Sequence, residues 1–198
     1  MSHRLARLSV LFFLAGCSIL EPRADPTRFF VLSPAVPPDG AAVAEPALVV
    51  AVGPVRLPDY LLRPELVRRA GPNQLEPSRV DRWAEPLDRA LLRVLCLDLA
   101  ALLPHSSIVP FPVAPSDKPA LQVELELTAF EGDRAGHVRL EGRMYLRDLA
   151  HGSRVAREFR LERAAANGET PELVATLSSM LSELAAVIAH EVGAGSPR

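Results

Sequence analysis

Residues 121–128, Leu-Gln-Val-Glu-Leu-Glu-Leu-Thr, alternate strictly between apolar and polar side chains. Successive side chains of a β-strand point to opposite faces, so this stretch predicts a strand with one buried and one charged face. The same alternation returns over residues 138–147 and 154–162, with glycines between the segments. Three such segments in a row predict an antiparallel meander. The Glu and Arg residues of its polar face can pair across strands, so we interpret that face as a solvated sheet surface in preference to a binding surface.

A long apolar segment precedes the meander. Residues 83–103 carry few polar side chains after Leu87, and a helix that is apolar on most sides is packed on most sides. We therefore expect a core helix here, with Pro86 tolerated in its first turn. Ser78 or Asp81 is the expected N-terminal cap.

A second helical pattern follows the meander. Residues 170–193 begin with Thr-Pro-Glu, which predicts a cap at Thr170 and a proline at the first helical position. Apolar residues recur at helical spacing, namely Leu173, Leu177, Met180, Leu181, Leu184 and Ile188. On the opposite, polar side we expect Ser178, Ser179, Ser182 and Glu183. The pattern predicts an amphipathic helix that lies on the sheet and ends at Gly193.

The N-terminal half of the chain supplies further strands. Apolar, β-branched and aromatic runs predict strands over residues 27–33, 47–55 and 108–111, and a hairpin with arms at 66–69 and 74–76. The run 47–55 has the composition of a strand buried on both faces. Residues 34–46 contain four prolines and are expected to form a loop. Residues 27–193 are thus predicted to form one α/β domain, followed by a tail of residues 194–198.

The N-terminus has the organisation of a bacterial lipoprotein precursor. Residues 1–16 combine a basic start, an apolar run and small residues before Cys17, which is typical of a secretory signal. The sequence Leu-Ala-Gly-Cys over residues 14–17 is similar to a lipobox, in which the cysteine is acylated and becomes the new N-terminus. An ordinary signal peptide with a chance cysteine is the less favoured interpretation. Residues 17–26 then form a lipidated N-terminus and short linker, and Ser18 resembles the outer-membrane default of lipoprotein sorting.

The overall composition excludes several classes of protein. The 198-residue chain has 22 basic and 24 acidic residues, a formal net charge of −2, whereas a nucleic-acid binder needs a basic stripe. Apolar residues make up 48% of the chain, which is enough for a sizeable core and argues against disorder. Two cysteines cannot by themselves form a disulfide framework or a four-ligand zinc site.

The sequence carries no recognisable catalytic constellation. Gly-x-Ser-x-Gly, Gly-x-x-x-x-Gly-Lys, His-Glu-x-x-His and Cys-x-x-Cys are all missing from it. The histidines after the signal segment are interpreted as surface residues: His105, His137, His151 and His190. Cys96, in the middle of the first long helix, is interpreted as a small hydrophobic residue. We therefore expect a binding or structural component, with no metal and no cofactor beyond the covalent lipid on Cys17.

A loop with unusually large side chains is the candidate interaction site. It follows the buried strand 47–55 and contains Leu57, Pro58, Tyr60, Leu61 and Arg63. Apolar side chains outside a regular element can anchor a partner, but a loop tucked over the end of the sheet explains them equally well. Trp83 is a further candidate anchor, although a core position at the start of a buried helix is favoured for it.

The order of these features resembles the ABC-type transport auxiliary lipoprotein family over essentially the whole chain after Cys17. The resemblance is carried by the lipobox, Pro26–Leu32 (PTRFFVL), Val52–Pro64 (VGPVRLPDYLLRP), Asn73-x-Leu75 and Arg82–Leu87 (RWAEPL). It implies a single three-layer α/β domain with a mixed, largely antiparallel sheet and two long helices. It also implies an outer-membrane-anchored periplasmic lipoprotein that docks the MCE-domain protein of an ABC-type phospholipid transport system. Such a subunit would support envelope integrity and have no enzymatic activity.

Two other functions remain open at this point. One is an envelope-assembly scaffold lipoprotein with the same compact fold and no lipid traffic. The other is a periplasmic lipid-binding carrier with a cavity between the first long helix and the sheet. Neighbouring genes for an MCE-domain protein and an ATPase would favour transport, and co-purifying phospholipid would favour the carrier. The sequence leaves open the lipid, the direction of transport and whether the chain forms a homo-oligomer.

Overall fold

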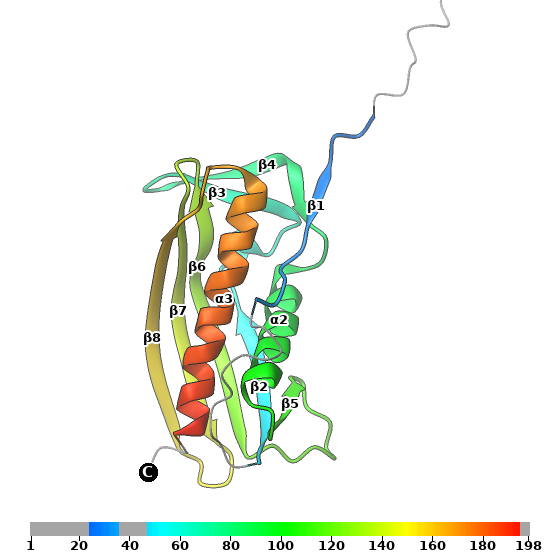
Figure 1. Cartoon of the computed structure of the whole chain (residues 1–198), viewed down its shortest axis with the longest axis vertical. Coiled ribbons are helices and arrows are strands. Elements are labelled where there is room, and N and C mark those ends of the chain that lie inside the picture. The colour runs from blue at the N-terminus through cyan, green and yellow to red at the C-terminus, as the bar shows by residue number, and fades with distance from the viewer. Residues whose placement is uncertain (1–23, 36–46, 195–198) are drawn as a thin grey trace, which may run out of the picture.

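The computed structural model describes residues 24–35 and 47–194, which form an eight-stranded mixed sheet and two long helices (Figure 1). The strands are β1 (Arg28–Phe30), β2 (Val49–Arg56), β3 (Glu65–Gly71), β4 (Gln74–Trp83), β5 (Ser107–Pro110), β6 (Leu121–Asp133), β7 (His137–Asp148) and β8 (Arg154–Ala164). The prediction of a single α/β domain with a mixed sheet and two long helices is confirmed, but both helices lie on one face of the sheet, so the described residues form two layers and not three. The predicted signal segment, Cys17 and residues 195–198 of the predicted tail lie outside the described residues.

The predicted meander is confirmed and forms the largest part of the sheet. β6 pairs with β7 and β7 pairs with β8, both antiparallel, with Leu125 opposite Met144 and Leu140 opposite Leu161. Because β6 is long, its other edge accommodates two strands, β2 along its first half and β3 at its end, both parallel. The remaining strands extend the sheet from these, β5 beside β2 and β4 then β1 beside β3.

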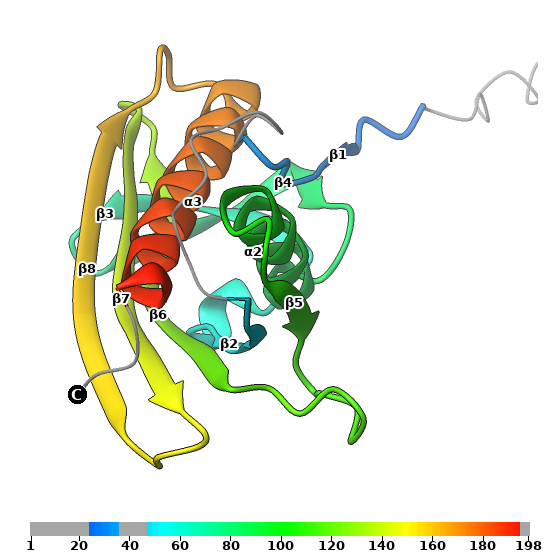
Figure 2. The ribbon, with the colours of Figure 1, turned by 60° about the horizontal axis from the view of Figure 1, so that its bottom comes forward.

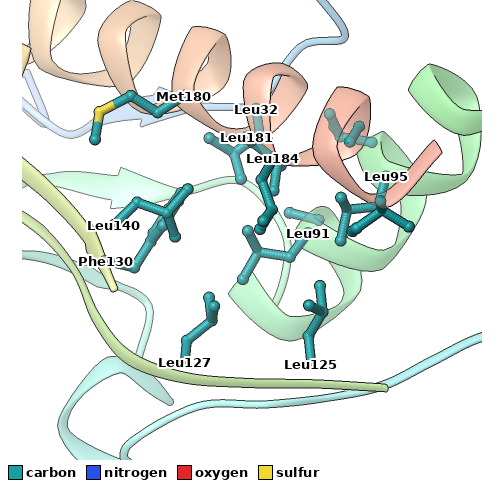
Figure 3. Packing of buried hydrophobic residues seen from close by; sticks show 14 of the residues in the cluster. Leu32, Leu91, Leu95, Leu125, Leu127, Phe130, Leu140, Met180, Leu181 and Leu184 are labelled. Atoms are coloured by element: carbon teal, nitrogen blue, oxygen red, sulfur yellow. The ribbon is translucent and has the colours of Figure 1, made fainter. Parts of the chain in front are cut away.

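The two helices form one layer against the sheet. α2 (Leu87–Leu102) and α3 (Thr170–Gly193) lie side by side on the same face of the curved sheet, α2 over β2 and β5 and α3 over β6, β7 and β8 (Figures 1 and 2). Leucines from both helices meet the inward side chains of β6 and β7 in a single apolar core (Figure 3). Length and composition alone would let α3 cross a membrane, but most of its residues are buried inside the domain.

The first helix starts later than the sequence pattern predicts. β4 continues to Trp83, whose backbone N–H donates to the Pro64 carbonyl, and α2 begins only at Leu87. Pro86 occupies the cap position, so it lies just before the first turn. The expectation that Ser78 or Asp81 caps this helix is therefore wrong, because both are strand residues. Trp83 is buried, as the favoured interpretation predicted, but it lies at the end of a strand and not at the start of the helix.

The polar side chains of α3 also differ from expectation. Glu169 occupies the cap position, and the Thr170 hydroxyl instead donates to Asp81 of β4. Ser178 and Ser182 are buried, not exposed. Their hydroxyl oxygens accept hydrogen bonds from the backbone N–H groups of Ser33 and Ala35, because the chain that follows β1 crosses α3 at this point.

Candidate interaction surface

The loop that follows β2 is fastened to the domain by its largest side chains. Its centre is one turn of 3-10 helix, Asp59–Leu61, and Leu61 is buried in the main core. Leu57 and Tyr60 are half-buried and pack against the same core, whereas Arg63 is exposed. Pro58 is half-buried at the start of the turn. Three of the five predicted site residues thus hold the loop on the sheet, and whether any of the five contacts a partner stays a prediction.

A buried carboxylate fixes the position of Tyr60. The Tyr60 hydroxyl donates to Oε2 of Glu131 over 2.7 Å, and the Glu131 side chain is fully buried. Oε1 of Glu131 accepts hydrogen bonds from Arg69 at 2.7 and 2.9 Å and from Arg139 at 3.0 Å. Burial, together with the hydrogen bond and charge of Glu131, raises the pKa of Tyr60 to about 12. The loop is therefore anchored by an aromatic ring whose hydroxyl is held in its neutral, donating form.

We expect this anchor to weaken only in strong alkali. The pKa of Tyr60 is higher in the folded protein than the ordinary value of 10.0, so its contribution to stability is complete below pH 10 and is lost as pH rises through about 12. Ultraviolet absorbance of phenolate during a pH titration measures this directly. Tyr60→Phe should remove the late-titrating signal and flatten the fall in stability over that interval. A Tyr60 phenolate that forms near pH 10 in the folded protein would contradict the buried hydrogen bond.

The two segments that flank the β3–β4 hairpin line a shallow apolar groove beside this loop. Residues 62–64 and 83–88 surround a hollow of about 440 Å³, which we call the Leu62–Trp83 groove. Its floor includes the buried Trp83, which is 7% exposed, and the buried Leu87. Leu62 on its rim is 54% exposed, so it extends the apolar surface of the groove to the solvent. The hydrogen bond from Trp83 N–H to the Pro64 carbonyl, 2.8 Å long, holds the two segments together.

Ion pairs stiffen both ends of the groove. Glu65 accepts hydrogen bonds from Arg63 at 3.0 Å and from Arg82 at 3.1 Å. At the other end, Glu85 accepts from Arg93 at 2.6 Å, and Arg93 also donates to the Leu32 carbonyl. An apolar hollow with a polar, paired rim is the arrangement of a protein docking site. Its two carboxylates, those of Glu85 and Asp88, belong to no group of three or more metal-ligating side chains within the described residues.

Several residues of this surface were not predicted as site residues. Leu62, Pro64 and Pro86 line the groove, and Glu131 holds the neighbouring loop through Tyr60. The large apolar side chain of Leu62 in a proline-bounded loop was a usable signal. The sequence contains no comparable signal for Glu131. Strand β6 has a bulge between Leu127 and Ala129, so the alternation of apolar and polar residues before the bulge does not predict which face Glu131 occupies.

Neither the four described histidines nor Cys96 lines the Leu62–Trp83 groove. His105, His137, His151 and His190 are exposed, as predicted. Cys96 is half-buried against the core, and burial raises the pKa of its thiol to about 11, so it stays protonated at neutral pH. Within residues 24–35 and 47–194, no group of three or more His, Cys, Asp or Glu side chains is arranged to hold a metal ion.

The polar face of the meander carries the predicted cross-strand ion pairs. Arg143 of β7 pairs with Glu158 of β8, and Arg160 of β8 approaches Glu141 of β7 at 3.5 Å. Glu124 is buried beneath arginines and accepts Arg147 at 2.9 Å. Because these charges satisfy one another across the strands, this face is less suited to an apolar partner than the Leu62–Trp83 groove.

Comparison with known proteins identifies a family whose members are similar to this chain. A family model described as "ABC-type transport auxiliary lipoprotein component" matches residues 30–189. The chain is 26% identical to the intermembrane transport lipoprotein PqiC of Escherichia coli (strain K12), over 97% of this chain and 98% of that protein. The protein of the same name from Shigella flexneri is equally similar.

Two solved structures share the fold. One, of an uncharacterized protein, has a TM-score of 0.69 at 24% identity and covers 84% of this chain and 98% of its own. The other, of a protein from Xanthomonas campestris, has a TM-score of 0.72 at 14% identity and covers 85% of this chain and 95% of its own. At these identities the likeness is one of fold alone.

Proposed function

Because the chain belongs to the ABC-type transport auxiliary lipoprotein family, we propose that it is the outer-membrane-anchored subunit of an intermembrane phospholipid transport system. In this role its domain stands in the periplasm, docks the MCE-domain protein that conducts lipid, and so supports envelope integrity. The similarity to PqiC, a lipoprotein of intermembrane transport, over nearly the whole of both chains supports the assignment. The domain itself would catalyse no reaction.

The anchor in this proposal is the acylated thiol of Cys17, which lies outside the described residues. Each buried methylene of an acyl chain contributes about 0.8 kcal/mol, so two or three chains give a stable attachment. The ten residues between Cys17 and Arg28 reach at most about 36 Å when fully extended. A tether of that length keeps the domain beside its own membrane, so the partner has to reach across the periplasm to it.

The observation that carries the docking role is the convergence of two segments in the Leu62–Trp83 groove. Both segments, Val52–Pro64 and Arg82–Leu87, are among those that carry the family resemblance, and the β3–β4 hairpin between them brings them together. The ion pairs at its two ends pre-order the groove, which lowers the entropy cost of binding. We infer that an apolar side chain of the MCE-domain protein occupies the hollow beside Leu62.

The lipid-carrier alternative is less well supported. It requires space between α2 and the sheet, but Leu91, Leu95 and Leu125 are at most 1% exposed and belong to the same apolar core, which fills that region (Figure 3). The scaffold alternative shares the same anchor and groove, so it differs only in the partner.

Crosslinking the lipidated protein in cells, followed by mass spectrometry of what co-purifies in mild detergent, separates these roles. Recovery of an MCE-domain protein, lost in Cys17→Ser, is the expected result, because the tether brings the groove to its partner. Recovery of outer-membrane assembly proteins alone would favour the scaffold and contradict the transport role.

Introducing a charge in the groove should weaken that recovery. Leu62→Glu places a carboxylate in the apolar hollow, and we expect the amount of crosslinked partner to fall about tenfold or more. A second variant, Arg63→Ala, removes an exposed residue beside the hollow. Leu97→Glu is the matched control, since Leu97 is 49% exposed on α2 away from the groove. Equal recovery from Leu62→Glu and Leu97→Glu would exclude the groove from the interface. Tyr60→Ala is less informative, because it also breaks the bond to Glu131.

A further inference from the structure

A second, polar cavity lies at the end of the domain where β1 begins. It has a volume of about 730 Å³ and is bounded by β1, the β3–β4 hairpin and the turn before α3. Four arginines line it: Arg28, Arg68, Arg79 and Arg134. One wall is formed by Gly168, where a Cβ atom would lie 2.3 Å from the Arg134 carbonyl oxygen, so only glycine lets these two turns approach so closely.

Two of the four arginines are already neutralised. Arg28 donates from Nε to Asp81 at 2.7 Å, and Arg134 forms a two-pronged pair with Glu76 at 2.7 and 3.1 Å. Burial alone would raise the pKa of Asp81, but hydrogen bonds from Arg28 and Thr170 outweigh it and hold that pKa below its ordinary value. Asp81 is therefore ionised, and its charge also acts on Arg68.

The other two arginines have no carboxylate partner among the described residues. Arg68 is half-buried and donates to the carbonyl oxygens of Gly168 and Asp133 and to the Thr170 hydroxyl, all of which are uncharged acceptors. Burial lowers its pKa, since the guanidinium is partly removed from water. Arg79 is exposed and makes no ion pair within the described part of the chain. Counted over the whole lining, four arginines face three carboxylates, those of Glu76, Asp81 and Glu169, so the cavity has one excess positive charge.

The cavity lies at the end of the domain from which the chain leads back toward Cys17. Figure 1 shows β1, the β3–β4 hairpin and the first turn of α3 at one end of the domain, and the last turn of α3 at the opposite end. α3 has 24 residues, so the two ends are separated by about 36 Å of helix. Arg28 is both a lining residue and the first residue of β1, so the chain that leads back toward Cys17 leaves the domain at this end.

We propose that this cavity binds a phosphate group, supplied by the headgroup of a phospholipid in the membrane that anchors the chain. A phosphodiester carries one negative charge, which matches the excess charge of the cavity, and guanidinium forks bind phosphate oxygens in pairs. The inference rests on the proposed lipid anchor. Its consequence is that the domain is held against the membrane with its hairpin end down, so that the far end of α3 points away from the bilayer.

Hydrogen exchange on the lipidated full chain tests this proposal. We compare the protein in alkyl maltoside micelles, in the same micelles with inorganic phosphate, and in phosphatidylglycerol vesicles. In vesicles, exchange at residues 74–81 and 166–172 should slow about tenfold, because local opening then requires release of the phosphate. Arg79→Gln should abolish most of this slowing, while Arg157→Gln, which removes the same charge from β8 beside Glu191 of α3, should leave it unchanged. Arg68→Gln is a secondary variant, since it also loses bonds to the wall of the cavity.

The outcomes separate the cavity from the anchor. Two outcomes would overturn the cavity proposal and leave the lipid anchor standing. In one, vesicles still slow exchange in Arg79→Gln; in the other, the wild-type protein floats with the vesicles but its exchange does not slow. Slowing by inorganic phosphate without slowing in vesicles would retain a phosphate site and overturn the headgroup as its source. A wild-type protein that does not float with vesicles would contradict the lipid anchor, and with it both proposals.

Discussion

Leu91→Ala should lower the free energy of unfolding by about 2–5 kcal/mol, toward the upper end of that range. Leu91 is fully buried in α2, between Leu184 of α3 and Leu125 of β6 (Figure 3). Truncation removes the transfer free energy of three carbons and leaves a void where α2, α3 and the sheet meet. Because three elements surround the site, no single one can move to fill it. Equilibrium unfolding in urea, followed by the fluorescence of the single tryptophan Trp83, gives the value.

Leu97→Ala is the matched control for this substitution. It makes the same chemical change on the same helix, but Leu97 is 49% exposed, so the loss should stay within about 0.5 kcal/mol. Similar losses for the two variants would mean that α2 does not present the face that the structure assigns to the core.

Glu131→Gln should destabilise the protein by about 3 kcal/mol, because it removes the only carboxylate that the guanidinium groups of Arg69 and Arg139 share. Removing one partner of a buried ion pair leaves the other charge poorly compensated: Arg69 loses its carboxylate, Arg139 keeps only Glu141 at 3.6 Å, and the Tyr60 hydroxyl loses its acceptor. The variant keeps the size of the side chain, so packing changes contribute little. Urea unfolding measures the loss, and phenolate absorbance supplies an independent readout: the pKa of Tyr60 should fall below about 12 once the Glu131 charge is gone.

Glu158→Gln is the control for the loss of one ion pair with little burial. Glu158 pairs with Arg143 on the outer face of the meander, but its side chain is 77% exposed, and exposed pairs contribute about 0–1 kcal/mol. If Glu131→Gln costs no more than Glu158→Gln, then Glu131 is hydrated in solution and the loop after β2 is not anchored by it.

Local periodicity predicted the elements correctly wherever one physical period dominated. The meander followed from period-two alternation, and its registers pair apolar with apolar residues, as for Leu125 and Met144. The stripe of α3 from Leu173 to Ile188 is buried as expected. In both cases a single buried face determines the pattern, so the pattern reveals the face.

Element boundaries were wrong where tertiary partners replaced local ones. Thr170 and Asp81 were each expected to cap a helix, and instead they bond to each other across 89 positions of sequence. Ser178 and Ser182 were predicted to lie on the polar, exposed side of α3, but the chain after β1 covers them. A side chain that can hydrogen-bond locally will bond to a distant group when folding brings one closer, and sequence spacing carries no record of that choice.

The sequence by itself determined the family resemblance, the fold class, the meander and the two core helices, because each depends on the periodic burial of apolar side chains or on a short ordered motif. It also marked the loop after the buried strand as a candidate surface. Only the tertiary structure decided that Leu57, Tyr60 and Leu61 hold this loop in place, that Leu62 and Trp83 line a common groove, and that Arg68 and Arg79 share a cavity. The reason is that the neighbours in a groove or charge cluster are set by how strands pair and how the hairpin packs on the domain, which local pattern does not record.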